Sequence, residues 1–143
     1  MNVKAILAAK GGDIFSIEPT ADLAAAARLL HTHRIGAAVI RGAGGRLAGI
    51  LSERDIVRAM AEHGVDALAV SVGQVMTRNV MTCSENDSIA DIMERMTSGK
   101  FRHLPVLRDG QLIGVVSIGD VVKQRVGEIE QDAEALREYI QTA

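Results

Sequence analysis

The chain has 143 residues, of which 48% are hydrophobic and 24% charged, and its formal net charge is −2. This balance is typical of a soluble globular protein, and the small net charge with only two Phe, one Tyr and no Trp argues against nucleic-acid binding. Cys83 is the only cysteine, which excludes an intrachain disulfide and a cysteine-based zinc site and favours a cytoplasmic setting. No apolar run is long enough for a signal peptide or a membrane span.

An internal duplication is the main feature of the sequence. Residues 14–57 and 80–122 each carry an apolar stripe with i, i+4, i+7 spacing, which predicts an amphipathic helix. The stripe residues are Leu23, Ala27 and Leu30 in the first copy and Ile89, Met93 and Met96 in the second. Thr20 and Asn86 stand three residues before these stripes, where a side-chain oxygen is expected to cap the helix.

The elements after each helix also match. Apolar runs at 37–40 and 104–107 predict one strand in each copy, and runs at 47–51 and 112–116 predict the next. The turns between them are glycine-rich at 42–45 and Asp109-Gly110 in the second copy, the latter a strong hairpin signal. A second helix is expected to begin near Ser52 and near Ser117. Each copy therefore predicts the order β-α-β-β-α, an α/β (α+β) fold.

We expect four segments: a first repeat with a lead-in helix (1–62), a linker (63–71), a second repeat (72–126) and a C-terminal amphipathic helix (127–143). Units this small bury little surface alone. We therefore expect the two repeats to pack through their sheets, about a pseudo-two-fold axis.

One motif occurs in both copies at a predicted strand-to-helix junction. It reads Gly, two apolar residues, Ser, two variable residues, Asp, and it ends at Asp55 and Asp120. Ser-x-x-Asp resembles a helix capping box, although the box prefers the longer Glu or Gln at its last position. The same geometry also suits a ligand, because a helix N-terminus attracts anions and a carboxylate can hold vicinal sugar hydroxyls. Both readings stay open at this point.

Taken together, these features resemble a tandem pair of CBS domains, the arrangement called a Bateman module. The resemblance rests on Ile35-Gly36-Ala37-Ala38-Val39-Ile40 against Arg102-His103-Leu104-Pro105-Val106, on the two Gly-x-x-Ser-x-x-Asp motifs, and on the lead-in Val72 to Thr82. It implies that Asp55 and Asp120 hold ribose hydroxyls, with Ser52 and Ser117 beside the ribose and phosphate. It also implies that adenine lies near the first strand of each repeat. The ligand-binding residues that follow from it are Ser16, Ile17, Gly36, Ala37, Ser52, Arg54, Asp55, Thr82, Cys83, Arg102, His103, Leu104, Pro105, Ser117 and Asp120.

The resemblance also implies that the two sites differ. In this family, basic residues before the Pro-Val strand of one repeat reach phosphate in the site whose Asp comes from the other repeat. Arg102 and His103 align with the uncharged Gly36 and Ala37. We therefore expect the better phosphate site at Ser52 and Asp55, served by Arg102, His103 and Arg54. Pro105 lacks a backbone donor and is expected at a sheet edge or a bulge.

The remaining motifs favour structural roles. His31 and His33, two residues apart, point to different sides of a helix and do not predict a metal site. No nucleophile elbow or P-loop is present. Residues 122, 126, 129, 133, 136 and 140 form an apolar stripe with alternating spacings of four and three. We expect this stripe either to fold onto the module or to pair with another chain, and the resemblance to CBS modules, which commonly form homodimers, favours pairing in a homodimer.

The sequence therefore predicts a regulatory module without catalytic activity that binds AMP or, less favoured, ADP, ATP or NAD(H). Its signal would pass to an unidentified protein partner or through its own oligomer. The alternatives are a structural or dimerisation module with empty clefts and, less favoured, a nucleotide-processing enzyme. No metal, nucleic acid or membrane is expected as a partner.

Overall fold

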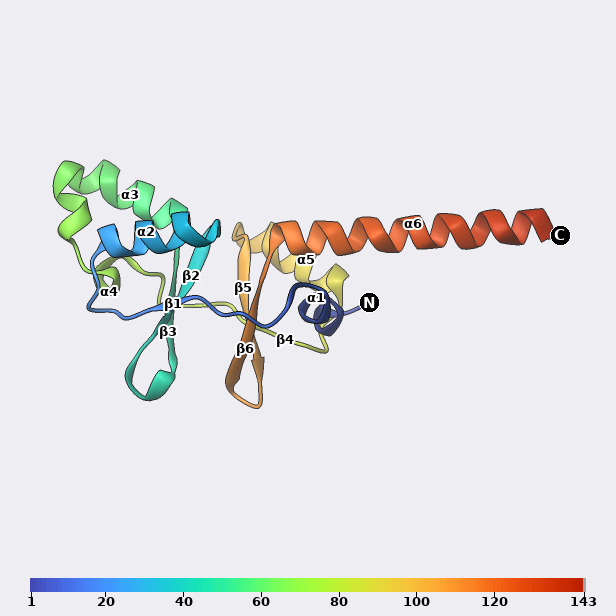
Figure 1. Cartoon of the computed structure of the whole chain (residues 1–143), viewed down its shortest axis with the longest axis horizontal. Helices are drawn as coiled ribbons and strands as arrows, with labels where there is room; N and C mark the ends of the chain where they lie inside the picture. The colour runs from blue at the N-terminus through green and yellow to red at the C-terminus, as the bar shows by residue number, and fades with distance from the viewer. Residues whose placement is uncertain (143) are drawn as a thin grey trace. The chain divides into compact units, whose positions relative to one another are not determined.

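The structure is a computed structural model, and it describes residues 1–142. The chain divides into two compact units, and each contains the larger part of one of the two predicted repeats (Figure 1). The repeat-1 unit comprises Asp13–Met81 with Asp109–Ile113. The repeat-2 unit comprises Met1–Gly12, Thr82–Arg108 and the chain from Gly114 onward. Both have mixed α and β structure, so the predicted duplication and fold class are confirmed.

The repeat-1 unit is built around a three-stranded sheet with the order β1-β2-β3. Strand β1 (Ser16–Ile17) is parallel to β2 (Ala37–Arg41), and β2 is antiparallel to β3 (Leu47–Ser52). Helix α2 (Leu23–His33) and helix α3 (Glu53–His63) accompany the sheet. Their apolar faces form one core with the strands, and Leu23, Ile40 and Leu51 are fully buried in it.

The predicted linker is part of this core. A 3₁₀ helix, η2 (Gly64–Ala69), follows α3 directly, and Ala67 in η2 is fully buried against α2 and α3. Helix α4 (Val72–Val75) follows and buries Val72 in the same core. Residues 63–71 therefore pack as folded structure that completes the repeat-1 unit.

The second sheet has the order β4-β5-β6, and apart from residues 109–113 its strands belong to the repeat-2 unit. Strand β4 (Cys83–Ser84) is parallel to β5 (His103–Arg108), and β6 (Gln111–Ser117) is the other neighbour of β5. Asp109 and Gly110 between β5 and β6 both have positive φ, 52° and 78°. This conformation is the one that a two-residue hairpin turn requires, so the Asp-Gly prediction is confirmed.

Three helices complete the repeat-2 unit. They are α1 (Val3–Lys10), α5 (Ile89–Gly99) and α6 (Ile118–Thr142). Helix α6 runs without a break through residue 127, where the sequence predicted the start of a separate C-terminal helix. Figure 1 shows it continuing well past α5 and α1 of the same unit. None of the helices among residues 1–142 has both the length and the apolar character needed to cross a membrane.

Each repeat is preceded by a lead-in segment, and each lead-in segment packs on the other repeat. Helix α1 precedes repeat 1, yet Val3 N–H donates to Asp87 O (3.0 Å) and Asn2 forms a β-bridge with Ser88. The segment before repeat 2 makes the corresponding contacts with repeat 1, where Ser71 forms a β-bridge with Asp22. The sequence predicted α1 as part of the segment 1–62, and the structure places its contacts in the repeat-2 unit.

The helix caps differ from the sequence prediction. Asp22 caps α2 and Ser88 caps α5, each accepting a hydrogen bond from the backbone N–H three residues later. Thr20 and Asn86 were therefore wrong as caps. The N-cap is the residue directly before the first helical one, where the backbone is still extended, and only Asp22 and Ser88 occupy that position.

Candidate functional site: two strand-to-helix junctions

The junction of repeat 1 joins β3 to α3 through a reciprocal pair of hydrogen bonds. Ser52 Oγ accepts from Asp55 N–H (3.3 Å), and Asp55 Oδ2 accepts from Ser52 N–H (2.9 Å). Ser52 Oγ also donates to Asp55 Oδ2 (3.2 Å). This is a complete capping box, so the shorter Asp reaches back as well as a Glu would, contrary to our expectation.

Asp55 is the buried charged residue of the repeat-1 unit, with 6% of its surface exposed. Its second oxygen, Oδ1, lies 3.0 Å from Nη2 of Arg58, one turn further along α3. The carboxylate is therefore held by its own cap on one oxygen and by its own helix on the other. Arg54, predicted to serve phosphate at this site, is exposed in the first turn of the same helix.

The junction of repeat 2 has the same backbone arrangement. Asp120 Oδ2 accepts from Ser117 N–H (2.9 Å), and Ser117 Oγ accepts from Asp120 N–H (3.2 Å). In both repeats the first helical N–H also donates to the residue before the middle strand. Glu53 N–H donates to Gly36 O (2.9 Å), and Ile118 N–H donates to Arg102 O (2.8 Å). Gly36 and Arg102 thus lie beside the Ser-x-x-Asp motif of their own repeat.

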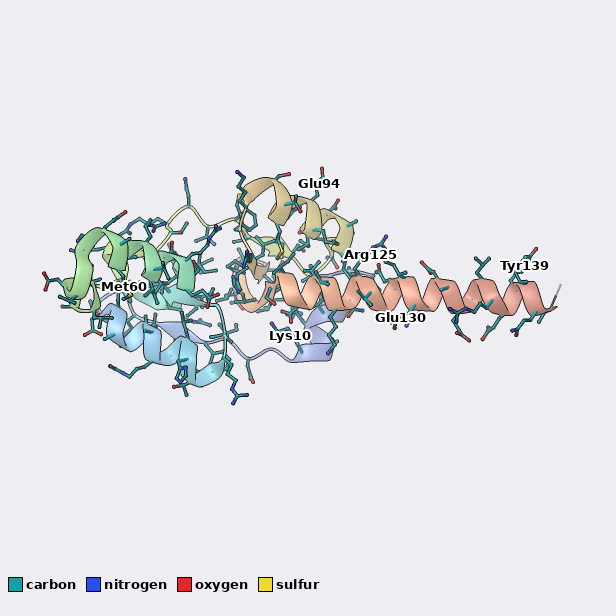
Figure 2. The ribbon with its side chains drawn as sticks, turned by 90° about the horizontal axis from the view of Figure 1, so that it is seen from above. Lys10, Met60, Glu94, Arg125, Glu130 and Tyr139 are labelled. Carbon is teal, nitrogen blue, oxygen red and sulfur yellow. The ribbon has the colours of Figure 1, made fainter. Side chains whose placement is uncertain are left out.

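Lys10 completes the junction of repeat 2, although it is not among the residues predicted from the sequence. Its Nζ donates to Asp120 Oδ2 (2.6 Å) and to Val115 O (2.9 Å) (Figure 2 labels Lys10). Burial raises the pKa of Asp120, but the hydrogen bonds from Lys10 and Ser117 outweigh it, so that this pKa lies below its ordinary value of 3.8. No local pattern could have identified Lys10, because 110 residues separate it from Asp120.

The equivalent position in repeat 1 is occupied by backbone. Ile50 corresponds to Val115, and its carbonyl accepts from Thr77 N–H (2.9 Å) while its N–H donates to Thr77 O (3.0 Å). The two lead-in segments thus cover the same part of the two junctions by different means. One uses a backbone bridge and the other uses a lysine side chain.

The glycine of each motif allows this close approach. A Cβ on Gly49 would lie 2.7 Å from Thr77 O and 2.8 Å from Met76 Sδ, and a Cβ on Gly114 would lie 2.7 Å from Leu7 Cδ2. All three distances are well inside van der Waals contact. Gly49 is therefore required where the backbone of Thr77 packs, whereas at Gly114 the contact is with the flexible end of Leu7.

The residues predicted near adenine lie on the strands of each unit. Ser16 and Ile17 form β1, exposed and half-buried respectively, and Ala37 is buried at the start of β2. In the other unit, Thr82 directly precedes β4 and is half-buried. Cys83 is buried in β4, and burial raises the pKa of its thiol to about 12, with a further contribution from the Asp87 carboxylate.

Pro105 lies on the middle strand β5, where an edge strand or a bulge was expected. Its counterpart Val39 donates its N–H to Phe15 O (3.2 Å) and pairs with Ser16. Proline has no N–H to donate, and in repeat 2 the parallel pairing begins one step later, at Cys83 and Val106. The edge assignment was therefore wrong, while the loss of a ladder hydrogen bond at this position is confirmed.

Arg102 and His103 belong to the repeat-2 unit, whereas Ser52 and Asp55 belong to the repeat-1 unit. Arg102 is exposed, His103 is half-buried, and Leu104 and Pro105 after them are buried. Their predicted service to the Ser52 and Asp55 site stays a prediction. Among residues 1–142, no group of three or more His, Cys, Asp or Glu side chains is arranged to hold a metal ion.

Comparison with known proteins matches the CBS domain family twice, over residues 3–62 and 72–127. A curated relative is the CBS domain-containing protein CBSX3, mitochondrial, of Arabidopsis thaliana, 36% identical over 120 residues. That match covers 81% of this chain and 58% of the relative, so the chain spans little more than half of the relative's length. A CBS-domain containing protein from Agrobacterium tumefaciens has a solved structure that is 46% identical. The match has a TM-score of 0.85 and covers 87% of this chain and 92% of that one.

Two further solved structures contain ligands. The CBS domain protein PAE2072 from Pyrobaculum aerophilum is complexed with AMP; it is 28% identical, with a TM-score of 0.75, over 84% of this chain and 89% of that one. The CBS domain pair of protein MJ0100 is in complex with 5′-methylthioadenosine and S-adenosyl-L-methionine. It is 26% identical, with a TM-score of 0.79, over 90% of this chain and 98% of that one.

Proposed function

Because this chain belongs to the CBS domain family and carries two copies of the domain, we propose that it is a regulatory module that binds an adenine nucleotide. The observation that carries the proposal is the repeated Ser-x-x-Asp junction. In both repeats a carboxylate is fixed in the first turn of a helix, at the end of a strand, by the same pair of hydrogen bonds.

The chemistry of the junction suits a ribose. An ionised carboxylate offers about four lone-pair sites, and the capping hydrogen bonds use only part of them. A ribose donates two neighbouring hydroxyl groups, which match a carboxylate held in one orientation. Such hydrogen bonds are charge-assisted and therefore stronger than those between neutral groups.

The phosphate requires positive charge, and each junction has some within its own unit. Arg54 and Arg58 lie in the first two turns of α3, and Lys10 lies against Asp120. The N-terminal turns of α3 and α6 add the favourable end of the helix dipole. AMP, which combines ribose, adenine and one phosphate, is the ligand we favour.

The ligands of related structures support this choice. AMP in the Pyrobaculum aerophilum protein and 5′-methylthioadenosine with S-adenosyl-L-methionine in MJ0100 share an adenosine group. In our proposal the nucleotide changes the fit of this module to a protein partner, or to a second copy of itself, and the chain catalyses no reaction. A cytoplasmic location stays a prediction from the sequence.

Isothermal titration of the full chain with AMP, ATP, NAD⁺ and S-adenosyl-L-methionine tests the proposal. We expect AMP to bind. Asp55→Asn and Asp120→Asn should each lower the affinity for AMP by about ten-fold or more, since a hydrogen bond to a charged group is worth about 1.5–3 kcal/mol. Asp22→Asn is the matched control, because Asp22 caps α2 outside both motifs and Asn is an equally good cap.

The possible results separate the two functions. Nucleotide binding is supported if titration with an adenine ligand releases or absorbs heat and this heat is reduced by Asp55→Asn or Asp120→Asn. Asp22→Asn should leave the heat unchanged. If no adenine compound binds and the purified protein carries none by mass spectrometry, the module is structural and the proposal fails. Unequal losses from the two Asp variants would identify the stronger site, which the sequence predicts at Asp55.

A further inference from the structure

The apolar stripe of α6 is exposed along most of the helix. Val122, Val126 and Ile129 are 44%, 47% and 53% exposed, and Leu136 and Ile140 are 60% and 64% exposed. Val121, on another face of α6, is fully buried. The helix thus uses one face for its own unit and leaves a second apolar face uncovered.

We propose that this face binds the same face of a second copy of the chain, so that two α6 helices form a parallel two-stranded coiled coil. The spacing fits a heptad in which Val126, Ala133 and Ile140 take position a and Val122, Ile129 and Leu136 take position d. β-Branched Val126 and Ile140 at a with Leu136 at d fit two strands, whereas the β-branched Val122 and Ile129 at d do not add to that preference. Ala133 allows the helices to approach closely at the centre.

The charges beside the stripe determine the orientation. In a parallel pair, a residue at position g faces position e of the next heptad in the partner helix. Arg125 at g then faces the partner subunit's Glu130, and Asp132 at g faces the partner subunit's Arg137. Both contacts join opposite charges, and each occurs twice by symmetry. Figure 2 shows Arg125, Glu130 and Tyr139 in succession along α6.

An antiparallel pair that keeps all six stripe residues in contact brings like charges together. Glu130 would face the partner subunit's Glu130, and Asp132 the partner subunit's Asp132. Lys123 would face the partner subunit's Arg137. Like charges at these positions are unfavourable, so the sequence opposes this orientation.

The other acidic residues of α6 do not oppose the parallel pair. Glu128, Glu134 and Glu138 fall at positions c, b and f, on the outer side of the coiled coil. Arg125 and Arg137 currently form pairs within α6, with Glu128 (2.9 Å) and Glu134 (3.5 Å). The two arginines are 48% and 71% exposed, and such surface pairs are weak enough to be exchanged for pairs across the seam.

The chemistry of the polar face argues against a membrane as the occupant. From residue 128 onward this face carries four Glu and one Asp but only one Arg. Helices that lie on membranes have Lys and Arg there, because lipid surfaces are anionic. The stripe is short for an isolated coiled coil, but the first turns of α6 are already fixed in the repeat-2 unit, so nucleation of the helix is already achieved.

Disulfide cross-linking of the full chain tests the orientation. In a Cys83→Ala background, Leu136→Cys is expected to give a covalent dimer on mild oxidation, because two d positions are adjacent in a parallel pair. An antiparallel pair would separate the two sulfurs by about ten residues, roughly 15 Å along the axis, beyond the approximately 7 Å Cα separation that a disulfide tolerates. Mixed Val126→Cys and Leu136→Cys chains cross-linking to each other would instead indicate the antiparallel pair and overturn the proposal.

A charge exchange provides the second test, read by sedimentation velocity. Arg125→Glu is expected to raise the dissociation constant of the dimer by about three-fold or more. The double variant Arg125→Glu with Glu130→Arg is expected to restore it. Glu138→Arg at outer position f is the matched control and should leave the dimer unchanged. A monomer at all concentrations, or a dimer that Leu136→Asp leaves intact, would overturn the proposal.

Discussion

The two strand-to-helix junctions share a backbone and differ in their charge partner. The hydrogen bond from Ser N–H to Asp Oδ2 is 2.9 Å in both, and the return bond from Asp N–H to Ser Oγ is 3.3 and 3.2 Å. Asp55, however, pairs with Arg58 of its own helix, whereas Asp120 pairs with Lys10 from the lead-in helix α1. The exposed fractions of the two Asp side chains differ accordingly, 8% for Asp55 and 24% for Asp120.

This difference shows what a duplicated unit must keep. The capping hydrogen bonds satisfy backbone groups that have no other intrahelical partner, so both copies retain them. The cation has no such constraint, and it can come from any element that approaches the carboxylate. The junctions have therefore diverged in electrostatics while keeping the same geometry.

Substitution of the motif glycines is expected to give the largest difference between the repeats. Gly49→Ala should destabilise the fold by about 3 kcal/mol, because the new Cβ meets the backbone oxygen of Thr77 at 2.7 Å. Gly114→Ala should cost only about 1 kcal/mol, because the new Cβ meets the flexible end of Leu7. Urea unfolding of both variants measures the two costs, and equal costs would show that Leu7 cannot move aside.

Removal of the long-range ion pair should have a moderate effect. Lys10→Met is expected to cost up to about 1 kcal/mol at neutral pH, since Lys10 is 36% exposed and solvent screens the pair. The pKa of Asp120 is lowered in the fold, so the ionised form is favoured and its stabilisation is present above the ordinary pKa of Asp. This stabilisation is lost as the pH falls through the lowered pKa.

The difference between Lys10→Met and the unmodified chain should therefore shrink in acid, and the pKa of Asp120 should rise in the variant. A carboxyl NMR titration follows that pKa directly. Arg58→Met is the matched control, since it removes the ion pair of the other junction and should not move the titration of Asp120. An unchanged pKa in Lys10→Met would contradict the assigned role of Lys10.

The smallest expected effect concerns Cys83, which occupies the position of Ile17 in the other repeat. Because the pKa of its thiol is about 12, it should not react with a thiol reagent at pH 8 until the protein is unfolded in urea. The neutral thiol is favoured in the fold, so its contribution to stability is complete below pH 9 and is lost as the pH rises toward 12. Cys83→Val should abolish this alkaline loss, and rapid labelling of the native chain would refute the buried position.

Most of the fold could be predicted from the sequence because its signals are local. The apolar stripes that begin at Leu23 and Ile89 predicted the first helix of each repeat, α2 and α5, and Asp109-Gly110 predicted the hairpin. Each of these signals depends on residues only a few positions apart. Among several neighbouring cap residues, however, the sequence could not show that Asp22 and Ser88 stand directly before the first helical turn. That choice depends on where the chain enters the helix.

The candidate site could be predicted only in part. Ser52, Asp55, Ser117 and Asp120 were recognisable because the motif occurs twice in the same register. Lys10 was not, because its role depends on α1 packing in the repeat-2 unit, which no periodicity within residues 1–12 indicates. The backbone contact of Thr77 with Ile50 was missed for the same reason.

The exchange of lead-in segments has a consequence for folding during synthesis. Residues 13–81 form nearly the whole repeat-1 unit as one continuous stretch, so its core can form as soon as that stretch has left the ribosome. Helix α1 is made first, but its partners Asp87, Val115 and Asp120 follow about 80 to 110 residues later. At ordinary rates of synthesis, several seconds pass between the synthesis of α1 and that of its partners. During this interval Val3 and Ile6, which are buried in the folded chain, lack the residues that cover them. The first helix of the chain is thus among the last to reach its native contacts.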